Sequence, residues 1–198
     1  MAIVGMAPAV ATATAYDAER IVRPMTRAFA ADPVIRWVYP GQREYLAWWP
    51  EVMRLYCGGA TARETAFVAD AGVGAALWLP PGVAPEAEAL GELLASSLPE
   101  ERQPEVFAFL GQMGEHHPAA PHWYLPFIGV DPREQGRGHG SALLRAALER
   151  CDRDGASACL KATTLDSRRL YERRGFETVG VIQFGGSPPM WPKVREPR

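Results

Sequence analysis

The stretch Val130-Asp-Pro-Arg-Glu-Gln-Gly-Arg-Gly-His-Gly-Ser-Ala-Leu-Leu144 decides the fold of this chain. A hydrophobic run (123–130) stops at Asp-Pro, three alternating glycines follow (Gly136, Gly138, Gly140), and apolar residues at helical spacing begin at once. This order predicts a strand, a glycine-rich turn and a helix N-terminus. Main-chain N–H groups at such a turn point outward, with the positive end of the helix dipole behind them. We therefore expect the segment to bind a phosphate or pyrophosphate.

The spacing of the glycines separates the possible phosphate loops. A P-loop needs Lys-Ser or Lys-Thr after its last glycine, whereas His-Gly-Ser stands at 139–141. A dinucleotide fingerprint needs Gly-x-Gly-x-x-Gly and an acidic residue at the next strand, which here carries Lys161. The pattern that fits is Gln-x-x-Gly-x-Gly, met by Gln135, Gly138 and Gly140. A tight strand-to-helix connection without a ligand is the alternative.

A second motif, Leu-Tyr-Glu-Arg-Arg-Gly-Phe, lies downstream at 170–176. One predicted helix and one predicted strand separate it from the glycine-rich turn. The motif predicts a short helix from about Ser167 that ends at Gly175, with Phe176 opening a strand. The two motifs together resemble those of the GNAT superfamily of N-acetyltransferases, and they occur in the same order along the chain as in that family. Three further segments are similar to the branch that contains puromycin N-acetyltransferase: 28–33, 76–82 and 122–125.

The resemblance implies an α/β (α+β) fold with a mixed, mostly antiparallel sheet of six to seven strands flanked by helices. Its centre would be a right-handed βαβ unit that splays apart to admit acetyl-CoA. We expect one domain over 1–198, with 1–8 ragged and a helical insertion at 84–120 before the central strand.

The spacing of hydrophobic residues, and the positions of the residues that break helices and strands, predict the individual elements. Helices are expected at 17–29, 44–56 and 138–154, and in the insertion at 85–115, broken at Pro99 and Pro104. Strands are expected at 9–14, 66–70, 74–79, 123–130, 158–163, 176–182 and 190–194.

The family relation also implies how the chain would hold acetyl-CoA. Pantetheine would pair with the backbone of Ile128 and Val130, and the pyrophosphate would rest on amides between Arg133 and Gly140. The Ile128 N–H would stabilise the oxyanion as an amine attacks. The complete expected cofactor set is Ile128, Gly129, Val130, Arg133, Gln135, Gly136, Arg137, Gly138, His139, Gly140, Ser141, Ser167, Leu170, Tyr171 and Arg174.

The chemistry needs two proton transfers. Tyr171 occupies the family's general-acid position and would protonate the leaving thiolate, unless it only forms a wall of the CoA tunnel. His122 and His117 precede or open the central strand and are the leading candidates for the base. Asp32, Glu44 and Glu51 are weaker candidates, and ordered water is the remaining alternative.

Aromatic residues dominate the presumed acceptor side, and half of them are expected to be plain core. They would suit a flat or partly apolar amine. Lys161 stands where the related branch has glutamate, so it either reverses a charge beside the pocket or points to solvent. The expected acceptor set is Phe29, Trp37, Tyr39, Trp48, Trp49, Trp78, Tyr124 and Lys161.

Composition narrows the function classes. A formal charge of -2 argues against a nucleic-acid binder, and three cysteines without ligand spacing suggest a reducing, cytoplasmic setting without a bound metal. The first 15 residues lack the positive start of a secretory signal, and no segment reaches membrane-spanning length.

The resemblance therefore implies an acetyl-CoA-dependent N-acetyltransferase. It would act on a primary amine of an antibiotic-like or other apolar small molecule, by direct attack in a ternary complex, as a monomer or homodimer. A protein or peptide N-acetyltransferase and a non-catalytic acyl-CoA sensor are the alternatives.

Overall fold

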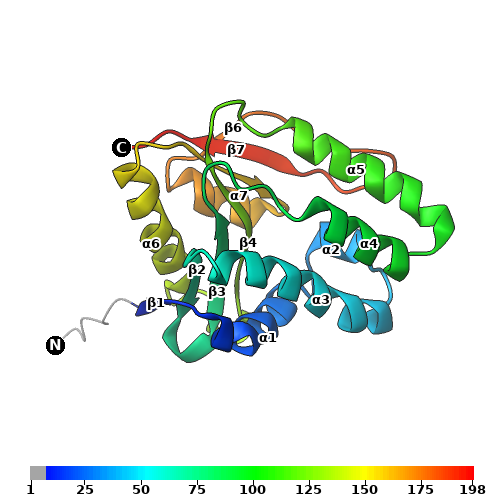
Figure 1. The fold of residues 1–198 in the computed structure, drawn as a ribbon, viewed down its shortest axis with the longest axis horizontal. Coiled ribbons are helices and arrows are strands. Elements are labelled where there is room, and N and C mark those ends of the chain that lie inside the picture. Colours follow the sequence, from blue (N-terminus) through cyan, green and yellow to red (C-terminus); the bar gives the residue numbers. More distant parts are fainter. Residues whose placement is uncertain (1–7) are drawn as a thin grey trace.

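The computed structural model describes residues 8–198 and contains a seven-stranded sheet in the order β1-β2-β3-β4-β5-β7-β6 (Figure 1). Neighbouring strands are antiparallel except β4 and β5, which are parallel. The mixed, mostly antiparallel sheet expected from the sequence is confirmed. The strands are β1 (Val10–Thr12), β2 (Ala66–Ala69), β3 (Gly74–Leu79), β4 (Trp123–Val130), β5 (Ala158–Ala162), β6 (Glu177–Thr178) and β7 (Trp191–Arg195).

Helices cover both faces of this sheet. In Figure 1, α6 lies to one side, while α1 and α3 lie below, and α4 and α5 extend away from α6. The helices are α1 (Ala18–Ala28), α2 (Pro33–Val38), α3 (Gln42–Thr61), α4 (Ala87–Ser97), α5 (Gln103–Glu115), α6 (His139–Arg153) and α7 (Leu165–Glu172). None of the helices within residues 8–198 is long and apolar enough to cross a membrane.

Three elements differ from the sequence expectation. The segment after Asp32 forms the short helix α2, because the Asp32 carboxylate accepts hydrogen bonds from the N–H groups of Val34 and Ile35, both at 3.0 Å. Pro104 does not break a helix but lies in the first turn of α5, where its missing N–H costs nothing. The strand expected at 176–182 shrinks to the two residues of β6 and a single bridge from Ile182 to Met190. The expectation of a ragged start at 1–8 falls outside the described residues except for Pro8.

The centre of the sheet opens as β4 leaves β5. The two strands pair from Trp123 to Leu125, and the pairing then stops although β4 runs on to Val130. On its other side, β4 carries a bulge against β3, where the register shifts between Leu77 and Leu79. Pro126 lies in this irregular stretch, as expected of a residue that cannot donate to a ladder.

The bulge changes which face of the sheet the β4 side chains meet. Before it, Trp123 and Leu125 pack on the α6 side. Beyond it, Phe127 packs on the α1 and α3 side, and a Cβ on Gly129 would lie 2.7 Å from the Ala28 side chain. The notch between β4 and β5 therefore connects the two faces at one point.

Candidate active site

The loop between β4 and α6 is fixed at both ends. The Asp131 carboxylate accepts a hydrogen bond from the Arg133 N–H at 3.1 Å and forms an ion pair with Arg27 at 2.8 Å, which ties the loop to α1. Gly136 and Gly138 have φ angles of 77° and 89°. Side chains rarely adopt this left-handed region, so the two glycines are needed for the backbone path itself. Gly138 is the N-cap of α6.

The main-chain N–H groups in the second half of this loop and at the start of α6 are unpaired within the described chain. From residue 136 to 141, none donates to an acceptor within the described chain, and the first bond of α6 runs from the Ala142 N–H to the Gly138 carbonyl at 3.0 Å. The Gln135 side chain donates to the Val130 carbonyl at 3.2 Å and closes the loop. A row of free amides at a helix N-terminus is an anion site, so the residues present fit a diphosphate.

The backbone of β4 is also free on the side of the notch. Main-chain groups alternate in direction along an antiparallel ladder, and the Asp131 N–H donates to the Val73 carbonyl of the β3 side at 2.8 Å. By this alternation, the N–H groups of Ile128 and Val130 point away from β3. They face the space that β5 has left, where an extended ligand could pair with them like an added strand.

One continuous cleft of about 850 Å³ joins the loop to the opposite face of the sheet. All of the expected cofactor residues except Arg133, Arg137 and Arg174 line it. Arg137 is held by an ion pair with Glu134 at 2.6 Å. Arg173, which the sequence reasoning did not select, lines the cleft where Arg174 does not.

Tyr171 lies in the wall of the cleft. Its ring meets Phe176 edge-on, with 6.0 Å between ring centroids, and only 6% of the residue is exposed. Burial, and secondarily the charge of Asp32, raises the pKa of its phenol well above the ordinary value. A phenol that stays protonated at neutral pH is a proton donor, as a general acid must be.

Asp32 is the one acidic candidate for the base, among Asp32, Glu44 and Glu51, that lines the cleft. It lies 131 positions from Thr163, whose hydroxyl donates to its carboxylate, and both residues line the cleft. Burial raises the pKa of Asp32 despite the three hydrogen bonds that it accepts. Sequence alone makes Asp32 only a weaker candidate for the base, because its contact with Thr163 depends on the tertiary fold.

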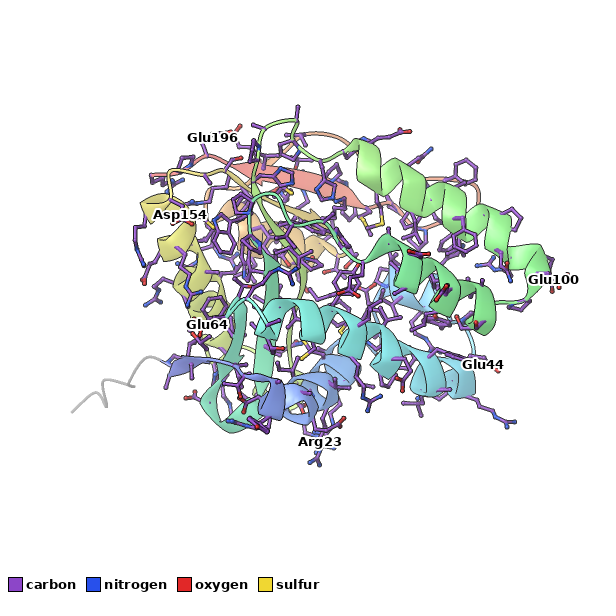
Figure 2. All side chains as sticks on the ribbon, viewed as in Figure 1. Arg23, Glu44, Glu64, Glu100, Asp154 and Glu196 are labelled. Atoms are coloured by element: carbon purple, nitrogen blue, oxygen red, sulfur yellow. The ribbon has the colours of Figure 1, made fainter. Side chains whose placement is uncertain are left out.

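The other acidic candidates for the base lie outside the cleft lining. Figure 2 shows Glu44 at the outer end of α3, at the periphery of the molecule, where it is exposed. Glu51 is exposed and paired with Arg54 at 2.6 Å. Neither carboxylate lines the cleft.

The two histidine candidates do not line the cleft directly but connect to it through Lys161. Lys161 lines the cleft, its Nζ lies 2.8 Å from the His117 Nε2, and the His117 Nδ1 lies 3.0 Å from the His122 Nε2. Lys161 also lies over the Tyr124 ring, 4.5 Å from its centroid. Lys161 therefore lies beside the pocket and does not point to solvent.

The aromatic candidates divide into two groups. Phe29, Tyr39, Trp49 and Tyr124 line the cleft, as do Tyr56, Phe109 and Phe127, which were not selected from the sequence. Trp37, Trp48 and Trp78 lie outside the lining. Trp78 faces the α6 side of the sheet, fully buried, with its ring 6.5 Å from that of Trp123.

Known proteins share this arrangement. Residues 83–176, which include the loop, match the model of the acetyltransferase (GNAT) family. A crystal structure described as histone acetyltransferase HPA2 and related acetyltransferase, from Corynebacterium glutamicum, is 27% identical, with 98% of each chain covered and a TM-score of 0.72. The chain is thus similar to GNAT acetyltransferases, in sequence over residues 83–176 and in fold over nearly its whole length.

Two other N-acetyltransferases share the fold or a part of the sequence. Arylalkylamine N-acetyltransferase 2 from Aedes aegypti superposes with a TM-score of 0.70 at 15% identity, covering 96% of this chain and 99% of that one. An N-acetyltransferase from Schizosaccharomyces pombe is 31% identical over 78 residues. That match covers 38% of this chain, and the chain spans about a third of the length of that curated relative.

The likeness to GNAT acetyltransferases agrees with the two halves of the cleft. GNAT acetyltransferases use acetyl-CoA, and the free amides of the loop and the open edge of β4 fit such a molecule. The expectation of a GNAT-type protein is confirmed at the level of the superfamily.

Proposed function

We propose that this chain transfers the acetyl group of acetyl-CoA to the primary amine of a small aromatic or apolar molecule, within the branch of the superfamily that contains puromycin N-acetyltransferase. One observation carries the proposal: a single cleft runs from the free amides of the loop, past Tyr171, to a pocket walled by aromatic side chains. Such a cleft suits two ligands that meet end to end.

The chain's own groups divide the work between binding and chemistry. The amides of residues 136–141 would hold the diphosphate, and the backbone of Val130 would pair with the pantetheine arm. When bound, acetyl-CoA supplies an electrophilic thioester and a thiol leaving group. The Ile128 N–H would face the thioester oxygen as negative charge develops there, an interaction worth about 3 to 4 kcal/mol in comparable sites. Tyr171 would give its proton to the sulfur.

The walls of the acceptor pocket favour a small molecule over a protein. Helices α2, α3, α4 and α5 all contribute apolar side chains to the cleft, among them Ile35, Val52, Leu94 and Phe109. A peptide acceptor is better served by an open polar groove, because its backbone needs hydrogen-bond partners. A flat amine can instead bury its apolar body against the aromatic walls.

Two measurements test the proposal together. Calorimetry with CoA measures binding at the loop end of the cleft. Thiol release from acetyl-CoA with a panel of amines measures turnover and tests the acceptor pocket. We expect CoA to bind, and turnover to be fastest with arylalkylamines or other flat primary amines. Acetylation of histone-tail peptides in preference to every small amine would favour the protein acceptor, and tight CoA binding without any turnover would favour the acyl-CoA sensor.

A further inference from the structure

A line of three basic side chains leads from the cleft toward solvent. Lys161 begins it in the cleft, His117 follows at 2.8 Å, and His122 follows His117 at 3.0 Å. At the outer end, the His122 Nδ1 lies 2.8 Å from the carbonyl oxygen of Ala120. Lys161 lies on β5, while both histidines belong to the segment between α5 and β4.

The hydrogens on this line can be assigned one at a time. A neutral imidazole has one N–H and one lone pair, and an ammonium group can only donate. With Lys161 charged, it donates to the His117 Nε2, so the hydrogen of His117 lies on Nδ1 and is donated to the His122 Nε2. The hydrogen of His122 then lies on Nδ1 and is donated to Ala120. Every polar atom on the line is satisfied.

A second arrangement satisfies the same atoms with the charge at the other end. If Lys161 is neutral, its lone pair accepts from the His117 Nε2–H, and the His117 Nδ1 accepts from the His122 Nε2–H. His122 is then an imidazolium whose Nδ1–H still donates to Ala120. The two arrangements differ only by a shift of hydrogens along two hydrogen bonds, with no movement of heavy atoms.

We propose that Lys161, His117 and His122 form a proton relay that carries the acceptor's ammonium proton from the cleft to solvent. The inference rests on the proposed function. Neutral Lys161 donates one N–H to the His117 Nε2 and uses its free lone pair to take a proton from the acceptor ammonium, which leaves a neutral amine to attack the thioester and makes Lys161 an ammonium. One proton then moves from Lys161 to the His117 Nε2 as another moves from the His117 Nδ1 to the His122 Nε2. The His122 imidazolium releases a proton to water, and charge is conserved at each step.

The surroundings of the relay suit its task. Burial lowers the pKa of Lys161 to about 8, near the range in which a lysine can both accept and release a proton. Burial, with the charges of Lys161 and His122, lowers the pKa of His117 to about 4, so His117 passes the charge on rather than keeping it. The other groups that face the line are the Tyr124 ring and the Cys159 thiol, whose pKa burial raises to about 12.

The same histidines lie near the Cys159 Sγ, which is 3.7 Å from the His117 Nδ1, so a bound cation is the competing reading. While Lys161 is charged, a metal on that nitrogen would force the hydrogen of His117 onto Nε2, facing the Lys161 ammonium at 2.8 Å. Two donors would then oppose each other. The relay leaves no such conflict, and we favour it for that reason.

Steady-state kinetics with the fastest amine of the panel tests the relay in Lys161→Met, His117→Gln and His122→Gln. We expect kcat at pH 7 to fall about 100-fold in Lys161→Met, as for the loss of a general base, and the remaining rate to rise with pH up to pH 10. The two histidine variants should show smaller losses in kcat. His116→Gln is the matched control, because the His116 Nδ1 lies beside the Gln112 carbonyl at 2.9 Å, off the line. Equal kcat and equal pH profiles in Lys161→Met and His116→Gln would overturn the relay.

Nitrogen NMR of the imidazoles gives a readout that does not need turnover. Below pH 8, His117 and His122 should both carry their hydrogen on Nδ1, and His117 should lose that preference in Lys161→Met. A hydrogen on the His117 Nε2 in the wild type at pH 7, or one equivalent of zinc in the purified protein, would refute the relay. If CoA binds but no amine reacts, the proposed function fails, while the NMR result still decides the hydrogen-bond line.

Discussion

Gly138→Ala separates the ligand role of the loop from its structural role. Gly138 has a φ of 89° at the N-cap of α6, where an alanine would cost about 1 to 2 kcal/mol because its Cβ approaches the carbonyl oxygen. Among residues 8–198, an added Cβ would otherwise meet only the Pro8 side chain, at 3.7 Å, which is an ordinary contact. The loss of stability should therefore stay near the backbone cost.

Gly155→Ala is the matched control, at the other end of the same helix. Gly155 follows α6 with a φ of 61°, and an added Cβ would meet no described residue within 4 Å. Gly155 does not line the cleft. Both variants should lose about 2 to 8 °C in Tm, since 1 kcal/mol corresponds to about 2 to 4 °C in a chain of this size.

CoA affinity should divide the two variants. In Gly138→Ala the new Cβ stands among the free amides, and each lost hydrogen bond to a charged phosphate costs about 1.5 to 3 kcal/mol. One lost bond weakens CoA binding by about 10- to 100-fold, whereas Gly155→Ala should bind as the wild type does. Calorimetry at a temperature where both variants are folded measures this. Equal affinities in the two variants would show that the loop does not hold the diphosphate.

Three further outcomes follow from single contacts. Tyr171→Phe should lower kcat by about 100-fold without weakening CoA binding, while Tyr16→Phe, at a fully exposed site, should leave kcat unchanged in the same thiol-release assay. Arg195→Met should lower the free energy of unfolding by about 1.5 to 3 kcal/mol in urea, because it removes the two hydrogen bonds at 2.7 and 2.9 Å from Arg195 to the Asp152 carboxylate, whereas Arg54→Met should cost less than about 1 kcal/mol. The Arg195 guanidinium lowers the pKa of Asp152, so this stabilisation is present above the carboxyl's unfolded pKa and should be lost as pH falls through its folded value, with urea unfolding between pH 6 and 2 as the measurement.

The sequence predicted the features that depend on residue type and on neighbours along the chain. Positive φ angles at Gly136 and Gly138 are a property of the residue type, and the helix that follows them needs only local periodicity. The end of α7 before Gly175, which has a φ of 87°, was predicted for the same reason. Both motifs that identified the superfamily belong to this class.

Contacts between distant segments were beyond the reach of the sequence. Every residue of β3 is buried, so the strand has no polar face that would mark its orientation. The sequence therefore did not reveal that Trp78 faces α6 rather than the acceptor pocket. The approach of Lys161 to His117 spans 44 residues and depends on the parallel register of β4 and β5. Residue types suggested a histidine base, but the sequence offered no reason to connect it with the lysine.

The ionisable groups of the pocket indicate the protonation state in which an acceptor amine reacts. Burial raises the pKa of Asp32 and lowers the pKa of Lys161, so both shifts favour a neutral side chain in the cleft. Their surroundings are aromatic and aliphatic, and such walls solvate an ammonium group poorly. The same physics favours the neutral amine over its cation once the acceptor is bound, which lowers the work that any base must do. An amine with a less basic nitrogen should therefore depend less on Lys161 than a strongly basic amine of the same shape.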